Sequence, residues 1–123
     1  MNVTLWIVQA LLAAAFLFAG VSKLTQHHDR LSEQMGWPGD FSPTFVKLIG
    51  GLEVLGAIGL ISPGVTGIAP ILVPLAATGL AVIQAGAVVV HLRRKEPQMV
   101  VINLVLIALA LFVAWGRFGD YAL

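Results

Sequence analysis

The sequence contains no cysteine and few charged residues. The absence of cysteine excludes disulfides, CxxC redox chemistry, thiolate metal sites and haem attachment through CxxCH. It also excludes four-helix quinone-linked enzymes whose mechanism depends on a dithiol. Any redox role therefore needs a bound cofactor or a partner protein.

Charge is low in amount and nearly balanced in sign. Charged residues make up 11% of the 123 residues and the formal net charge is +1, whereas soluble domains are about 25% charged. There is no basic stripe, so we expect no nucleic-acid partner. Hydrophobic residues make up 59% of the chain, against about 45–50% in soluble domains. We predict an integral membrane protein with one domain, residues 1–123, and no separate soluble module.

Four apolar segments are each long enough to cross a hydrocarbon core of about 30 Å as a helix. They cover approximately residues 3–24, 44–61, 66–91 and 98–118. The period-2 alternation of a transmembrane β-strand occurs in none of them. Residues 1–3 contain no Lys or Arg, so we expect a retained first helix and not a signal peptide. The predicted fold class is all-α: an integral membrane four-helix bundle.

Three links join these segments. Residues 25–43 form a long polar link with aromatic residues, which we expect at the level of the lipid headgroups. A tight turn is predicted at Ser62–Val65, and residues 91–97 form a short basic turn. Pro70 and Pro74 either lie in the first turn of the third helix or kink it.

Basic residues are concentrated at one end of the predicted bundle. Arg117 and the amino terminus belong to the other end. Since cytoplasmic loops carry an excess of Lys and Arg, we predict that the links 25–43 and 91–97 are cytoplasmic and that both termini are outside. The basic residues at the cytoplasmic end are Lys23, Arg30, Lys47, Arg93, Arg94 and Lys95.

Each predicted helix carries polar residues together with small ones on a single face, at steps of three or four positions. An ionisable group at mid-membrane costs about 2.5–3.5 kcal/mol on insertion scales, so such a face is expected to point into the bundle. Glu53 lies close to the middle of its segment, and Lys23 is its best partner. We expect five residues to converge in one half of the bundle as a ligand-binding site or buried polar cluster: Lys23, Glu53, Gln84, His91 and Asn103.

Alternatives stay open for these residues. Lys23 and Glu53 either only fix helix packing or bind a proton or a small lipophilic ligand. His91 either belongs to this site or lies among headgroups beside the basic turn, which sets topology and contacts anionic lipids. No metal site is predicted at residues 27–29, because adjacent histidines do not share a helix face and no ligands follow at suitable spacing.

Several motifs resemble the DoxX-like family, in the expected order from about residue 5 to 118. They are Ala-Gly-Val-Ser-Lys-Leu ending at Leu24, Met-Gly-Trp-Pro in the first link, Gly-Gly-Leu-Glu-Val-Leu-Gly-Ala-Ile-Gly-Leu ending at Leu60, Ser-Pro-Gly after it, and His-Leu-Arg-Arg-Lys-Glu-Pro ending at Pro97. The resemblance implies a small multi-pass protein of the bacterial inner membrane. Onto this sequence it carries only the positions of Lys23, Glu53 and His91.

The resemblance also implies partners. Related DoxX and DoxD proteins are associated with membrane oxidoreductase assemblies, including quinone-linked oxidation of thiosulfate and oxidative-stress complexes, and distant animal relatives act as membrane chaperones or cargo receptors. The first hypothesis is therefore an accessory subunit of a membrane redox or stress-response assembly. Its polar interior would hold a quinone, a lipid or a similar lipophilic molecule, with Glu53, Lys23 and His91 as polar contacts.

Two other hypotheses come from different classes of protein. A structural or assembly scaffold would use the polar stripes only for packing, and a homodimer could use the small-residue surface of Gly56, Ala57 and Gly59. A proton-coupled small multidrug transporter has a similar length and four helices, but its key glutamate lies in the first helix, and here that helix has none. No nucleophile–base set or phosphate loop is present, so no reaction is predicted.

Overall fold

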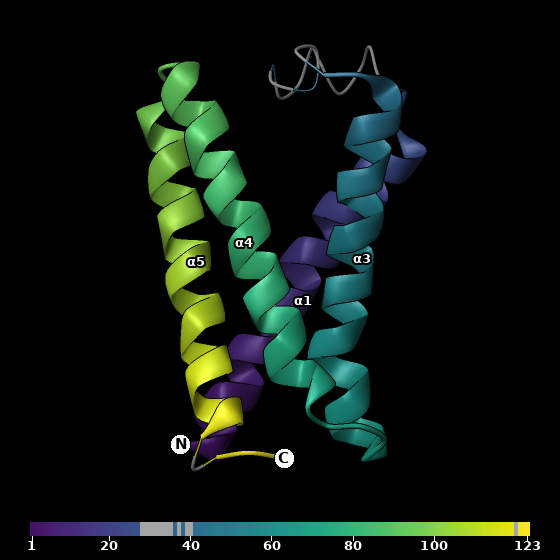
Figure 1. Cartoon of the computed structure of the whole chain (residues 1–123), viewed down its shortest axis with the longest axis vertical. Helices are drawn as coiled ribbons and strands as arrows, with labels where there is room; N and C mark the ends of the chain where they lie inside the picture. The colour runs from purple at the N-terminus through teal and green to yellow at the C-terminus, as the bar shows by residue number, and fades with distance from the viewer. Residues whose placement is uncertain (28–35, 37, 39–40, 120) are drawn as a thin grey trace.

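The computed structural model describes residues 1–27, 36, 38, 41–119 and 121–123. These residues form four helices and no strand: α1 (Asn2–Thr25), α3 (Pro43–Thr66), α4 (Leu72–Arg93) and α5 (Pro97–Phe118) (Figure 1). Each helix is long and apolar enough to cross a membrane. The predicted all-α membrane bundle is therefore confirmed.

The predicted tight turn at Ser62–Val65 is wrong, because α3 continues through these residues to Thr66. Pro63 lies inside α3 and removes one helical hydrogen bond there. The helix continues past Pro63 to Thr66, whose hydroxyl donates to the Ser62 carbonyl at 2.7 Å. It ends at Gly67, whose φ of 75° favours glycine and whose N–H donates to the Pro63 carbonyl.

The third apolar segment becomes helical later than predicted, at Leu72 instead of residue 66. Residues 67–71 connect α3 to α4, and Pro70 belongs to this connection. Pro74 lies in the first turn of α4, where an N–H would have no acceptor within the helix. Neither proline therefore interrupts the interior of α4.

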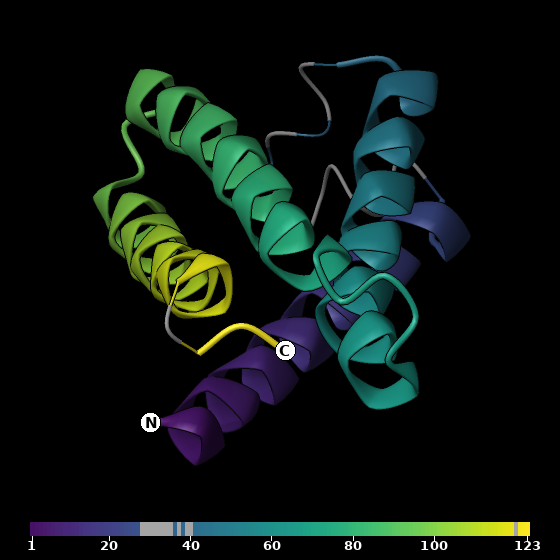
Figure 2. The same cartoon turned by 60° about the horizontal axis from the view of Figure 1, so that its bottom comes forward.

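The helices pack most extensively as two pairs, α1 with α3 and α4 with α5. The pairs meet at the end of the bundle that holds both termini, which we call the closed end. They diverge toward the opposite end, the open end, so that the outline is a V (Figures 1 and 2). At the open end, α1 ends and α3 begins, and a short turn joins α4 to α5. The assignment of this end to the cytoplasm stays a prediction.

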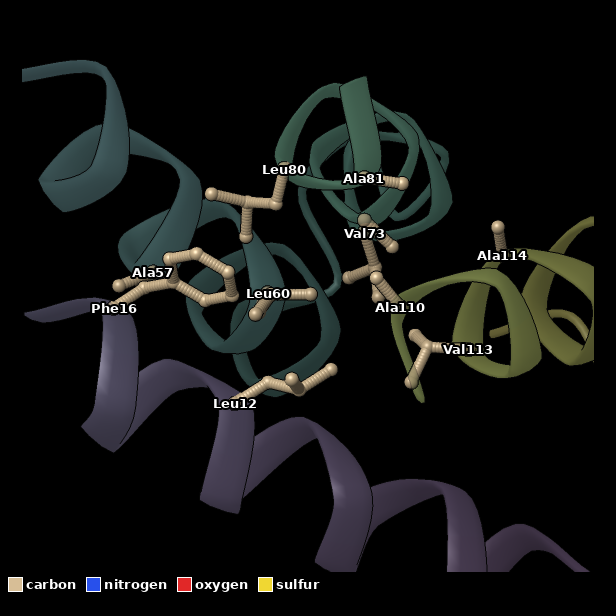
Figure 3. Close-up of a cluster of buried hydrophobic side chains, with 11 residues drawn as sticks. Leu12, Phe16, Ala57, Leu60, Val73, Leu80, Ala81, Ala110, Val113 and Ala114 are labelled. Atoms are coloured by element: carbon tan, nitrogen blue, oxygen red, sulfur yellow. The ribbon is translucent and has the colours of Figure 1, made fainter. Parts of the chain in front are cut away.

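A cluster of buried apolar side chains occupies the middle of the bundle and its closed half (Figure 3). They come from the middle of α1, the second halves of α3 and α5 and the first half of α4. Many are alanines, whose small side chains let membrane helices approach closely. The cluster consists of Leu12, Phe16, Ala57, Leu60, Val73, Ala77, Leu80, Ala81, Ala110, Val113 and Ala114.

Two glycines bring the backbones of α1 and α3 together in the open half. A Cβ atom added to Gly20 would lie 2.6 Å from the Gly50 carbonyl oxygen, and one added to Gly50 would lie 2.7 Å from Lys23 Cβ. Neither space accommodates a side chain without movement of backbone. The contact of Gly20 with Gly50 therefore sets the spacing between α1 and α3 beside Lys23.

The small-residue surface expected on the second helix is used within the chain. A Cβ atom added to Gly56 would lie 2.6 Å from Leu80 Cδ2, and one added to Gly59 would lie 2.9 Å from Ala76 Cβ. Both neighbours belong to α4. A homodimer of this fold would therefore need a different surface.

The contact between α1 and α3 makes a stability prediction. Gly20→Ala should lower the free energy of unfolding by about 1–3 kcal/mol, because the new methyl group overlaps backbone atoms of α3. Gly86→Ala is the matched control, since no atom lies within 4 Å of its added Cβ. Thermal unfolding in lipid nanodiscs measures both, and equal midpoints for the two variants would contradict the close contact.

Candidate functional site

A cavity of about 670 Å³ lies between the two helix pairs in the open half of the bundle. All the described helices contribute to its wall. Most lining side chains are apolar, including Phe16, Phe41 and Phe45, and the rings of Phe41 and Phe45 stack with their centroids 5.0 Å apart. The five residues predicted from the sequence all line this cavity: Lys23, Glu53, Gln84, His91 and Asn103.

An ion pair between α1 and α3 forms one wall of the cavity. Lys23 Nζ lies 2.7 Å from Glu53 Oε1, and the two side chains are only 8% and 3% exposed. The contact of Gly20 with Gly50 places them there, because Gly50 packs directly on the Lys23 side chain. The pairing expected from the sequence is therefore present in the structure, which leaves both its interpretations, packing and ligand binding, open.

Two amide side chains form part of the opposite wall. Gln84 comes from α4 and Asn103 from α5, and both are buried. Asn103 Nδ2 is buried with no hydrogen-bond partner in the described part of the chain. Burying an amide donor without an acceptor is unfavourable, so this group is a candidate contact for a molecule in the cavity.

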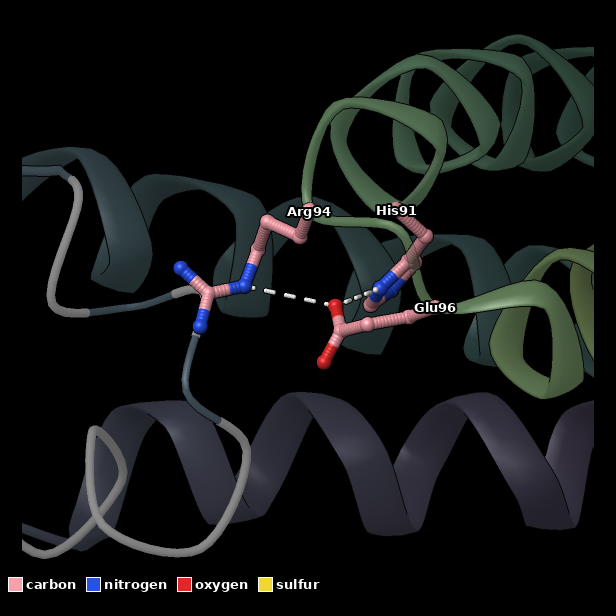
Figure 4. Close-up of polar contacts among 3 residues, drawn as sticks. All are labelled: His91, Arg94 and Glu96. Carbon is pink, nitrogen blue, oxygen red and sulfur yellow. Dashed lines mark hydrogen bonds and ion pairs between the residues drawn. The ribbon is translucent and has the colours of Figure 1, made fainter.

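Charged side chains lie where the cavity meets the open end. The Nδ1 atom of His91 lies 2.9 Å from Glu96 Oε1, and Arg94 Nε lies 3.3 Å from the same oxygen (Figure 4). The hydrogen bond from His91 is the main cause that lowers the pKa of Glu96 below its ordinary value, and the charges of His91 and Arg94 add to the effect. The carboxylate of Glu96 thus joins the side chains of His91 and Arg94 across the turn between α4 and α5, at the cavity mouth.

Sequence reasoning missed Glu96 and the two phenylalanines. The pattern of residues 91–97 predicts a basic turn and a candidate site residue at His91 but gives no role to Glu96, although Glu96 follows His91 by five positions across a tight turn. That spacing was the available signal for the pair. Phe41 precedes α3 and Phe45 lies in its first turn, but no pattern in the sequence says that they face a cavity.

A second polar cluster lies at the closed end, separated from the cavity by the apolar core. Arg117 Nε donates to Gln9 Oε1 at 2.7 Å, and its Nη1 donates to Asn2 Oδ1 at 2.7 Å and to the Tyr121 carbonyl at 2.8 Å. Gln9 Nε2 in turn donates to the Leu60 carbonyl at 2.7 Å. The polar stripes therefore do not form one continuous interior. This cluster ties α1 to α5 and α3.

Metal binding finds no support in the side chains described. Among residues 1–27, 36, 38, 41–119 and 121–123, no group of three His, Cys, Asp or Glu side chains is arranged to hold an ion. Residues 28 and 29 of the His-His-Asp run, Arg30 and the Met and Trp of the Met-Gly-Trp-Pro motif lie outside the described residues. For that run the absence of a metal site stays a prediction.

The model of the DoxX-like family matches residues 7–113, which is most of the 123-residue chain. No curated protein and no solved structure matches the chain significantly.

A double-mutant cycle tests the ion pair of Lys23 and Glu53. Lys23→Met or Glu53→Leu alone should each cost about 3–5 kcal/mol of stability, since each leaves one buried charged or polar group without its partner. The combined variant should recover most of this loss, because both polar groups are then absent. Unfolding in lipid nanodiscs measures the three variants. Simple addition of the two single losses would show that the residues do not interact.

The cavity mouth makes a pH prediction. The folded-state pKa of Glu96 is below the ordinary value of 4.5, so its stabilising contribution is present above the unfolded pKa and is lost as the pH falls through the lower folded value. The wild type should therefore be more stable than Glu96→Gln near neutral pH, and the difference should vanish in acid. Thermal midpoints of both proteins between pH 7 and pH 3 measure this, and a difference independent of pH would contradict it.

Proposed function

The chain belongs to the DoxX-like family, and we propose that it binds a small lipophilic molecule, quinone-like in character, in the cavity of its open half. In this proposal it acts as an accessory component of a membrane redox or stress-response assembly. The observation that carries the binding proposal is the cavity itself, with a buried ion pair on its wall.

The size and lining of the cavity fit a ligand site. Small-molecule sites are typically about 300–1,000 Å³, mostly apolar and furnished with a few polar groups that fix orientation. The cavity of about 670 Å³ has apolar walls and places Lys23, Glu53, Gln84, His91 and Asn103 on them. A bundle built only for packing would have no need to keep such a volume.

The depth of the ionisable groups supports the same proposal. Charged residues inside a membrane are costly, and where they occur they commonly mark ligand, ion or proton sites. Lys23 and Glu53 are buried in the transmembrane helices α1 and α3 but lie on the cavity wall. The redox or stress-response assembly rests on the family resemblance alone, in which DoxX and DoxD proteins are partners of membrane oxidoreductases.

The proposed location is the bacterial inner membrane, with the open end in the cytoplasm. The family resemblance supports the membrane, and the basic residues support the orientation. Lys47, Arg93 and Lys95 belong to helix ends or the turn at the open end, whereas Arg117 belongs to the last turn of α5 at the closed end. Cytoplasmic segments carry the excess of Lys and Arg.

A structural scaffold is the second candidate, and the short ion pair favours it. Lys23 and Glu53 lie 2.7 Å apart, so each already has a partner without any ligand. A scaffold of this kind would lose function only through loss of protein. A small multidrug transporter is less well supported, since its carboxylate belongs on the first helix and Glu53 lies on α3.

Filling the cavity tests the proposed function. Ala87 on α4 lines the cavity, and Ala87→Trp should block binding by occupying the space. Ala85→Trp is the matched control, because Ala85 is exposed on the same helix and does not line the cavity. Native mass spectrometry and solvent extraction of protein purified in nanodiscs should detect one retained lipophilic molecule with the wild type and the control, and none with Ala87→Trp.

Two outcomes would contradict the proposal. The first is a wild-type protein that retains no molecule beyond the general lipids of the nanodisc. The second is a molecule retained equally by Ala87→Trp, since it would then bind outside the cavity.

A further inference from the structure

The charged groups on the inner wall of the cavity already compensate one another. Lys23 Nζ and Glu53 Oε1 lie 2.7 Å apart and are almost completely buried. Wherever the shared proton lies, the pair carries no net charge. A permanent charge on a ligand at this depth would have to separate the pair or remain unpaired, and both are costly in a medium of low dielectric constant. A neutral ligand meets no such cost.

On the α5 side of the cavity, Asn103 lacks a hydrogen-bond acceptor in the described part of the chain. Its side chain is 5% exposed and lines the cavity. Its Nδ2 group is buried and has no acceptor among the described residues. A primary amide nitrogen only donates hydrogen bonds, so the partner that this group lacks is an acceptor, such as a carbonyl oxygen.

The neighbours of Asn103 limit where that acceptor can be. Met99 and Leu106 lie four positions before it and three positions after it on α5, and both line the cavity. This puts one polar donor between two apolar side chains on the same helix face. A fitting molecule is therefore apolar over most of its surface, with an oxygen at the level of Asn103.

We propose that the cavity selects neutral lipophilic molecules with a hydrogen-bond-accepting oxygen, and that Asn103 is the residue that donates to this oxygen. This inference rests on the proposed function, because it concerns the ligand of the same cavity. It separates the ligand from two other lipophilic classes, amine cations and carboxylate anions. A carboxylate ligand would have to remain at the cavity mouth near Arg93, where it could not accept a hydrogen bond from Asn103.

A matched set of probes tests this selection. Benzophenone is a neutral diaryl ketone, and diphenylmethane has the same two rings without the oxygen. Diphenylmethylamine and diphenylacetate carry a positive and a negative charge at pH 7. Photolabelling by benzophenone in nanodiscs, with peptides identified by mass spectrometry, reports occupancy of the cavity. Competition by the other three probes gives their affinities, each corrected for partition into the lipid.

The expected order follows from the hydrogen bond and the charges. Benzophenone should bind about five- to tenfold more tightly than diphenylmethane, and the two charged probes should bind more weakly than either. Asn103→Leu should reduce benzophenone affinity to that of diphenylmethane and leave diphenylmethane unchanged. Asn103→Ala provides a second variant without the donor should the first fail to fold. Gln98→Leu is the control, since Gln98 is exposed on α5 and does not line the cavity.

The outcomes distinguish this inference from the proposed function. If benzophenone and diphenylmethane bind equally and Asn103→Leu changes neither affinity, the cavity binds lipophilic molecules but does not select for an accepting oxygen. That result would leave the proposed function intact and overturn this inference. Tighter binding of either charged probe would overturn it too. Absence of benzophenone labelling from the cavity peptides of the wild type would contradict the proposed function itself, and this inference with it.

Discussion

The ion pair between Lys23 and Glu53 is the interaction on which the open half of this bundle depends. Two charged groups within apolar helices are tolerated only when they satisfy one another. The contact of Gly20 with Gly50 allows this by bringing α1 and α3 close at the level of Lys23. The same contact keeps α1 and α3 together as a unit while α4 and α5 diverge from them. One wall of the cavity is therefore set by electrostatics and close backbone packing together.

The closed half supplies the complementary constraint. Arg117 joins Gln9 of α1 to α5, and Gln9 continues the chain of hydrogen bonds to the Leu60 carbonyl of α3. Between this cluster and the cavity lies the alanine-rich apolar core. Helices fixed at one end by packing and hydrogen bonds can diverge at the other end without losing their register. The V shape therefore creates the cavity, and the contacts that stabilise this shape lie in the closed half, away from the proposed ligand site.

Sequence patterns predicted the helices and the lining residues better than the shape. The length of the apolar segments predicted the helices, and polar residues at helical spacing predicted five residues that the structure places on the cavity wall: Lys23, Glu53, Gln84, His91 and Asn103. That they form a ligand site stays a prediction. The turn predicted at Ser62–Val65 was wrong because Pro and Gly usually end helices, whereas here α3 includes Pro63 and continues to Thr66, where Gly67 caps it. The divergence of the pairs, the role of Glu96 and the separate Arg117 cluster depend on contacts between distant segments, which periodicity along one helix does not encode.

The central claim is that the cavity holds a ligand in the membrane. A side-chain-resolution structure of the protein in lipid nanodiscs, with a rigid binding partner to aid particle alignment, tests this most directly. The account predicts density for a small molecule between Asn103 and the pair of Lys23 and Glu53, with an oxygen within hydrogen-bonding distance of the Asn103 amide. Helix pairs closed against one another, with Glu53 bonded only to Lys23 and no space between the walls, would contradict it and support the scaffold alternative.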